Sequence, residues 1–141
     1  MYKKILIPSD GSEYAMRAAE YALEVAKENP AVEITIVYAY QLVPDLALDT
    51  PFTPSIITFA DEQAQAILEK TAKVFEDAGI KAETVVRRGD PGREIAALAR
   101  EGGYDHIIMG TRGAGALGGL IFGSVAQKVV QLAPCPVLLV K

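Results

Sequence analysis

Residues 107–124, with the sequence IIMGTRGAGALGGLIFGS, decide the fold expected of this chain. The stretch opens with an apolar run, Ile107-Ile108-Met109, which predicts a buried strand, and it leads into residues 125–130, which predict a helix. Between them lie six of the 12 glycines in the chain. A strand that passes through a glycine-rich loop into a helix start suits phosphate. The loop can turn its N–H groups inward, and the helix start adds unpaired donors and partial positive charge.

The rest of the chain alternates strands with helices. Apolar runs predict strands at residues 4–8, 32–40, 81–87, 105–109 and 136–140. Helical spacing and end signals predict helices from Asp10-Gly11-Ser12 to Asn29-Pro30, over 58–78, from Pro91 through Arg100, and from Gly123 or Ser124 to Leu132. This alternation predicts an α/β fold with one open, five-stranded parallel sheet of order 3-2-1-4-5 and helices on both faces.

A ligand in such a sheet sits beyond the carboxyl ends of the strands, at the point where the strand order reverses. For the order 3-2-1-4-5 this point lies between the first and fourth strands. The first strand ends at Pro8-Ser9-Asp10, and the fourth ends at Met109-Gly110. The glycine-rich loop therefore falls where the fold is expected to bind a ligand.

Two other segments carry expectations of their own. Residues 41–57 hold three prolines and show no clear period, which predicts a functional or mobile connection. The last strand, with Val137–Val140 at its end, would form an apolar edge of the sheet. Such an edge is an aggregation hazard unless it is covered, and pairing with the same strand of a second copy would cover it. The edge therefore predicts a homodimer.

Composition bounds the class of protein. The 141 residues predict one domain, 1–141, and 50% of them are hydrophobic, which is enough for a core. A net charge of −4 argues against nucleic-acid binding. No apolar run is long enough to cross a membrane, and the start shows no signal-peptide pattern. With a single cysteine, Cys135, we expect a cytoplasmic location.

Charge is unevenly distributed along the chain. No acidic residue follows Asp105, whereas Arg112, Lys128 and Lys141 do. The acid-free segment favours an anionic ligand at the glycine-rich loop. The alternative is that a buried strand, loop and helix simply lack charges.

The glycine spacing resembles a known family. Gly110-Thr111-Arg112-Gly113, then nine residues, then Gly123-Ser124 matches the G-x2-G-x9-G-(S/T) pattern of the universal stress protein family, in its ATP-binding branch. The start, Lys3 to Ser12, and the end, Ala133 to Val140, also resemble the first and last strands of that family. The resemblance covers the whole chain. It implies a flavodoxin- or Rossmann-like fold, a homodimer and an adenine nucleotide, ATP. The cofactor we expect is ATP, with or without Mg or Mn bound through the phosphates.

The resemblance also implies a nucleotide-binding set. Asp10 would bond the nucleoside, mostly its ribose, and Ala39 would lie against adenine. The family usually has a bulkier residue, often Val, at this position, so either the pocket wall is looser here or Tyr40 compensates. The loop and the helix start would carry the ribose and phosphates. The full set is Pro8, Ser9, Asp10, Ala39, Met109, Gly110, Arg112, Gly113, Gly123, Ser124 and Val125.

Several of these residues have structural alternatives. Asp10 could cap the first helix, and Ser124 could cap the last helix or bond a phosphate. Arg112 could meet a phosphate or stay solvated. We expect Lys128 at the surface, and Arg87 and Arg88 in solvent.

The sequence offers little for catalysis. The glycine-rich loop lacks the G-x4-G-K-(S/T) pattern of a P-loop and contains no lysine. His106, the one histidine, starts the fourth strand, roughly 10–13 Å from its other end at ~3.3 Å per residue. No catalytic triad or Cys/His metal set can be built at the site.

Three functions remain open. The first is an ATP-binding stress or signalling switch, with little or no catalysis, whose state is read by an unidentified protein partner. The second is a slow metal-dependent ATP hydrolase, in which positioning and a metal ion do the work. The third is a dimeric interaction module that does not require nucleotide.

Overall fold

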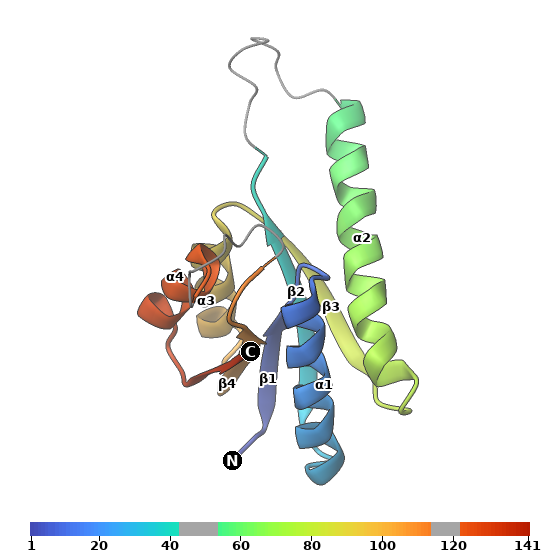
Figure 1. The fold of residues 1–141 in the computed structure, drawn as a ribbon, viewed down its shortest axis with the longest axis vertical. Helices are drawn as coiled ribbons and strands as arrows, with labels where there is room; N and C mark the ends of the chain where they lie inside the picture. Colours follow the sequence, from blue (N-terminus) through green and yellow to red (C-terminus); the bar gives the residue numbers. More distant parts are fainter. Residues whose placement is uncertain (43–53, 114–121) are drawn as a thin grey trace.

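The computed structural model describes residues 1–42, 54–113 and 122–141. They form a five-stranded, all-parallel sheet of order β3-β2-β1-β4-β5, as predicted, with four helices (Figure 1). The strands are β1 (Lys4–Pro8), β2 (Glu33–Tyr40), β3 (Ala82–Arg88), β4 (His106–Gly110) and β5 (Val137–Val140). The helices are α1 (Glu13–Glu28), α2 (Pro54–Glu76), α3 (Pro91–Glu101) and α4 (Ser124–Leu132).

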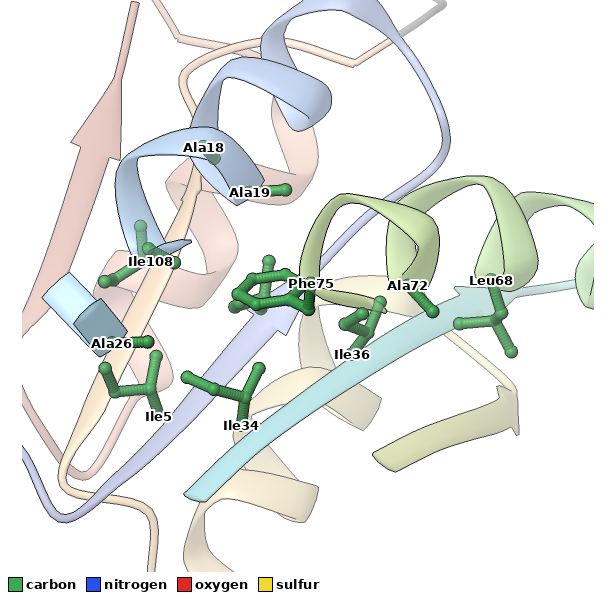
Figure 2. Packing of buried hydrophobic residues seen from close by; sticks show 12 residues of the cluster. Ile5, Ala18, Ala19, Ala26, Ile34, Ile36, Leu68, Ala72, Phe75 and Ile108 are labelled. Carbon is green, nitrogen blue, oxygen red and sulfur yellow. The ribbon is translucent and has the colours of Figure 1, made fainter. Parts of the chain in front are cut away.

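Each face of the sheet has its own hydrophobic core. On one face, α1 and α2 pack against β1, β2 and β4, and Phe75 lies between the helices and the strands (Figure 2). The stripe of small residues on α1, which includes Ala18 and Ala22, lets that helix approach the sheet closely. On the other face, α3 and α4 cover Leu6, Val37 and Ile107. The central strands are therefore apolar on both faces, as a parallel sheet requires.

The strand ends agree with the sequence prediction to within one residue, but α2 does not. We predicted that this helix begins at Thr58, and it begins at Pro54. Proline is compatible with a first helical turn, because its missing N–H would have no intrahelical acceptor there. The predicted connection over residues 41–57 is therefore shorter at its far end. Its middle, residues 43–53, lies outside the described residues.

Ser12, rather than Asp10, caps α1. The Ser12 Oγ accepts the Ala15 N–H at 3.4 Å, while Asp10 Oδ1 accepts the Ser12 N–H at 2.9 Å. Asp10 thus shapes the turn that leads into the helix and leaves the capping position to its neighbour.

Arg87, which we expected to be solvated, and Lys128, which we expected at the surface, both form ion pairs. Arg87 donates to Glu94 at 3.2 Å and to Glu101 at 3.1 Å, which joins the end of β3 to α3. Lys128 passes over Gly92, where a Cβ would lie 2.6 Å from the lysine Cβ, and its Nζ reaches both Asp90 carboxylate oxygens at 3.3 Å. The α3–α4 pair is therefore held by close packing and an ion pair, which fixes where α4 begins.

At the amino edge of the sheet, Asp105 ties the start of the chain to β4. Its Oδ2 accepts the backbone N–H groups of Lys3 at 3.1 Å and Lys4 at 2.7 Å, and its Oδ1 lies 2.6 Å from His106 Nδ1. Burial by itself raises the pKa of the Asp105 carboxyl. The bonds from His106, Lys4 and Lys3 outweigh burial, so that the pKa lies below its ordinary value.

None of the helices in the described residues is both long and apolar enough to cross a membrane.

We predict that Asp105→Ala lowers the free energy of unfolding by about 1–3 kcal/mol at neutral pH, because two backbone donors lose a charged acceptor. The folded-state pKa of Asp105 is lowered, so its stabilisation is complete above the unfolded-state pKa of about 3.9 and is lost as the pH falls through the folded-state value. Urea unfolding at a series of pH values should therefore show the deficit shrinking below about pH 5.

Asp77→Ala is the control, since that carboxylate is 66% exposed in its pair with Lys73. It should change stability little at any pH. A deficit of the Asp105 variant that stays constant into acid would contradict the prediction.

Candidate functional site

A cleft of about 590 Å³ opens at the carboxyl edge of the sheet, where the strand order reverses between β1 and β4. All eleven residues of the predicted set line it. So do eight others, among the described residues: Ala15, Val37, Tyr38, Tyr40, Gln41, Pro91, Ile95 and Ala126. The geometry thus brings the predicted set together in one place. Whether these residues hold a nucleotide stays a prediction.

Two glycines bring the end of β4 and the loop after it against α1 and the turn that precedes α1. A Cβ on Gly110 would lie 2.8 Å from the backbone carbonyl carbon of Tyr14, so glycine is needed for α1 to pack on the end of β4. A Cβ on Gly113 would lie 2.6 Å from Asp10 Oδ2. The loop backbone therefore lies against the Asp10 carboxylate, with no side chain between them.

The start of α4 forms the opposite wall of the cleft. Gly123 is the N-cap, and its N–H donates to the Thr111 carbonyl at 2.7 Å. Ser124 is the first helical residue and not the cap, which rules out the capping role considered for its hydroxyl. The N–H groups of Ser124, Val125 and Ala126 belong to the first turn, which has no intrahelical acceptors. This wall can therefore offer several backbone donors to an anion.

Arg112 is one of two charged side chains on the cleft wall, with Asp10 the other, among the described residues. The guanidinium of Arg112 lies over the ring of Tyr14, with its carbon 5.7 Å from the ring centroid. Arg112 is thus not fully solvated, and it forms no ion pair with the residues that the structure describes. It remains placed to meet an anion at the loop.

The β2 residues that line the cleft alternate between the two faces of the sheet. Val37 and Ala39 belong to the core cluster beneath α3 and α4. Tyr38 and Tyr40 point to the other face, with ring centroids 5.6 Å apart and nearly parallel rings. Burial raises the pKa of the Tyr38 phenol, and the nearby Asp10 carboxylate and Tyr40 raise it further. Tyr38 therefore stays neutral and keeps its hydroxyl proton at physiological pH.

Sequence reasoning missed most of the β2 wall and the whole α3 wall. Pro91 and Ile95 of α3 line the cleft because α3 starts at the same edge of the sheet as the loop. The rule that places ligands at the carboxyl ends of parallel strands would have found both, had it been applied to β3 and the helix after it.

The candidates for catalysis lie elsewhere. His106 is at the amino end of β4, beside Tyr2, whose ring centroid is 4.4 Å from its own. Lys128 is engaged with Asp90. Residues 1–42, 54–113 and 122–141 contain no group of three or more His, Cys, Asp or Glu side chains that could hold a metal ion.

The fold and the cleft define an open parallel α/β domain with a candidate ligand site at its strand-order reversal. The model of the universal stress protein family matches residues 1–141. The chain belongs to this family.

Individual relatives support the same family assignment. A universal stress protein of Thermus aquaticus is 41% identical over 146 residues, covering all of both chains. One from Methanocaldococcus jannaschii is 38% identical over 142 residues, covering 100% of this chain and 83% of the relative. The solved structure of a second protein of that organism superposes with a TM-score of 0.87 at 33% identity, covering 100% of this chain and 96% of the other.

The contact between Gly113 and Asp10 can be tested by a double-mutant cycle. We predict that Gly113→Ala destabilises the protein by about 1–3 kcal/mol, because the new methyl group overpacks against the carboxylate. Combining it with Asp10→Ala should cost less than the sum of the two single substitutions. Urea unfolding of the four proteins measures this, and strict additivity would show that the two residues do not touch.

Proposed function

We propose that this protein binds an adenine nucleotide, by preference ATP, in the cleft between β1 and β4, and that it acts as a cytoplasmic stress or signalling switch with little or no catalysis. The observation that carries the proposal is the meeting of three features in one cleft of about 590 Å³: the start of α4, the Asp10 carboxylate and an apolar β2 wall. A volume of ~300–1,000 Å³ is usual for small-molecule sites.

The polarity of the cleft supports one orientation of the nucleotide. Phosphates fit the α4 start, where backbone N–H groups and the helix dipole favour negative charge. The Asp10 carboxylate would repel phosphates, but it can accept hydrogen bonds from ribose hydroxyls. The base then falls on the β2 side, against Val37, Ala39 and Ile95.

Solved structures of the fold support the choice of ligand class. A universal stress protein in complex with cAMP superposes with a TM-score of 0.74, and one from Archaeoglobus fulgidus in complex with dAMP superposes with 0.71, each at 24% identity. At 24% identity these structures are similar to this chain in fold, and the binding of an adenine nucleotide by this chain is part of our proposal.

A divalent ion, Mg²⁺ or Mn²⁺, would be held chiefly by the phosphates. The described residues around the cleft offer one carboxylate, Asp10, and no three-ligand cluster. Since Asp10 is assigned to the ribose, this donor set suits an ion that arrives with the nucleotide. No carboxylate or imidazole of the described lining then remains to act as a base near the γ-phosphate, which favours a binding role over hydrolysis.

The nucleotide site is tested by Gly123→Val. A Cβ at Gly123 would meet the backbone of Arg112 and Gly113 at ordinary contact distances of 3.5 and 3.6 Å, so the fold tolerates it. The larger side chain would fill the gap between loop and helix. We expect it to remove at least one hydrogen bond between the protein backbone and the charged phosphates. Such a bond contributes about 1.5–3 kcal/mol. Calorimetry with ATP and Mg²⁺ should therefore show affinity at least about tenfold weaker than wild type.

Gly79→Ala is the matched control. Gly79 follows α2 at the opposite edge of the sheet and has a φ of 73°, so alanine there strains the backbone without reaching the cleft. It should bind ATP like wild type. Wild-type protein that binds no adenine nucleotide would overturn the proposal and favour an interaction module that does not need one.

We propose further that the protein is a homodimer paired through β5. Val137–Val140 are all half-buried, and within the described residues β5 pairs with β4 alone. The Pro136 carbonyl accepts the N–H of Ile107 in β4, and the Val140 carbonyl accepts the N–H of Thr111, the residue after β4. By the alternation of a parallel strand, the N–H of Leu139 points to the open edge.

We predict that Leu139→Pro makes the protein monomeric while it stays folded, because proline removes an outward donor and keeps the ladder to β4. Leu139→Ala is the control, since it trims the same side chain but retains the N–H, and it should remain dimeric. Sedimentation equilibrium gives the mass of each. A monomeric wild type at micromolar concentration would refute the dimer.

A further inference from the structure

Tyr40 is the last residue of β2 and lines the cleft, and its hydroxyl is bonded by two charged side chains. The Tyr40 residue is 9% exposed and lines the cleft. Its hydroxyl donates to Asp61 Oδ1 at 2.7 Å and accepts from Arg88 Nε at 3.2 Å. Arg88 Nη2 also donates to Asp61 Oδ1 at 2.6 Å. Residues of β2, β3 and α2 therefore meet at one phenol oxygen.

Asp61 lies in a part of α2 that has little other packing. The first half of this helix rises past the carboxyl edge of the sheet (Figure 1), and the first buried residue of α2 is Ala64. The second half is anchored to the cleft by other contacts. Thr71 shares a buried hydrogen bond of 2.8 Å with Ser9, and Lys70 Nζ donates to the Gly11 carbonyl at 2.8 Å. Asp61 extends this anchoring to the projecting half.

The pair of Asp61 with Arg88 is a poor candidate for global stabilisation. Their side chains are 42% and 54% exposed, and exposed ion pairs contribute little to the free energy of unfolding. The bond from Arg88, followed by that from Tyr40, lowers the pKa of the Asp61 carboxyl. The carboxylate is therefore ionised at neutral pH and accepts both bonds. Its geometric effect falls on the Tyr40 ring, whose orientation these bonds restrict.

We propose that Asp61, with Arg88, is a positioning residue for the ligand: by holding the Tyr40 side chain on the α2 face of the sheet it fixes the end of β2, whose Ala39 lies at the base end of the cleft, and thereby couples occupancy of the cleft to the order of the first half of α2. The inference rests on the proposed function. Coupling is reciprocal, so a ligand that is bound more tightly because Tyr40 is fixed must also stabilise the contact of Asp61 with Tyr40. Binding of a ligand in the cleft would then change the order of the first half of α2, which lies outside the cleft.

The experiment compares ATP binding, thermal stability and amide exchange in the full chain. Wild type, Tyr40→Phe, Asp61→Asn and the double variant are titrated with ATP and Mg²⁺ by calorimetry. We expect each variant to bind at least about fivefold more weakly, the lower end of typical couplings, while the melting temperature stays close to that of wild type. The double variant should bind no more weakly than Tyr40→Phe, because that substitution already removes the hydroxyl through which Asp61 acts.

Hydrogen exchange supplies the second readout. ATP should slow amide exchange over residues 55–63 of the wild type and should not do so in Tyr40→Phe. Asp77→Asn is the matched control, because Asp77 accepts an ion pair from Lys73 of α2, at 3.1 Å, at the far end of the same helix. This variant should bind ATP like wild type and keep the ATP-dependent protection.

The outcomes separate the two proposals. If wild type binds ATP but Asp61→Asn binds equally well, or if ATP protects α2 equally in Tyr40→Phe, the positioning role is wrong and the nucleotide site stands. If wild type binds no adenine nucleotide, the proposed function falls and this inference falls with it. Weaker binding in step with a large loss of melting temperature would also overturn the inference, because the residues would then be merely structural.

Discussion

The packing of α1 against the end of β4 is the contact on which the cleft depends. It requires a residue without a side chain at Gly110, since a Cβ there would lie 2.8 Å from the backbone of Tyr14. This approach carries the loop after β4 against the β1–α1 turn, where Gly113 meets the Asp10 carboxylate. From there Thr111 receives the N–H of Gly123 and fixes the start of α4. One steric constraint therefore assembles three walls of the site.

The two edges of the sheet have different tasks. At the amino edge, Asp105 accepts the backbone N–H groups of Lys3 and Lys4 and pairs with His106. The polar groups there hold the start of the chain against β4. At the carboxyl edge, the helix start of α4 presents its first-turn N–H groups to the cleft. A parallel sheet produces this asymmetry, because every helix that follows a strand begins at the carboxyl edge and brings its positive end there.

Polar contacts connect residues of the cleft wall to a helix that does not line the cleft. Ser9 and Tyr40 belong to the wall, yet their hydroxyls are bonded to Thr71 and Asp61 of α2, a helix outside the wall. A protein that works by binding needs such a link, because a bound ligand influences a partner only through groups whose arrangement differs between the empty and filled site.

The sequence by itself determined the order of strands and helices, the parallel sheet and the gathering of the eleven residues at its reversal point. These follow from local apolar periods, turn residues and the spacing of glycines, and chain topology does the rest. Tertiary structure alone decided the partners of Arg87, Arg88 and Lys128, and the place of Tyr38 and Tyr40 in the cleft lining. It also decided that Gly123 caps α4 and that α2 begins at Pro54. The reason is physical: a charged or aromatic side chain pairs with whichever groups the neighbouring elements bring within reach. Which groups these are depends on the packing of elements that are distant in the sequence, and no local pattern encodes that packing.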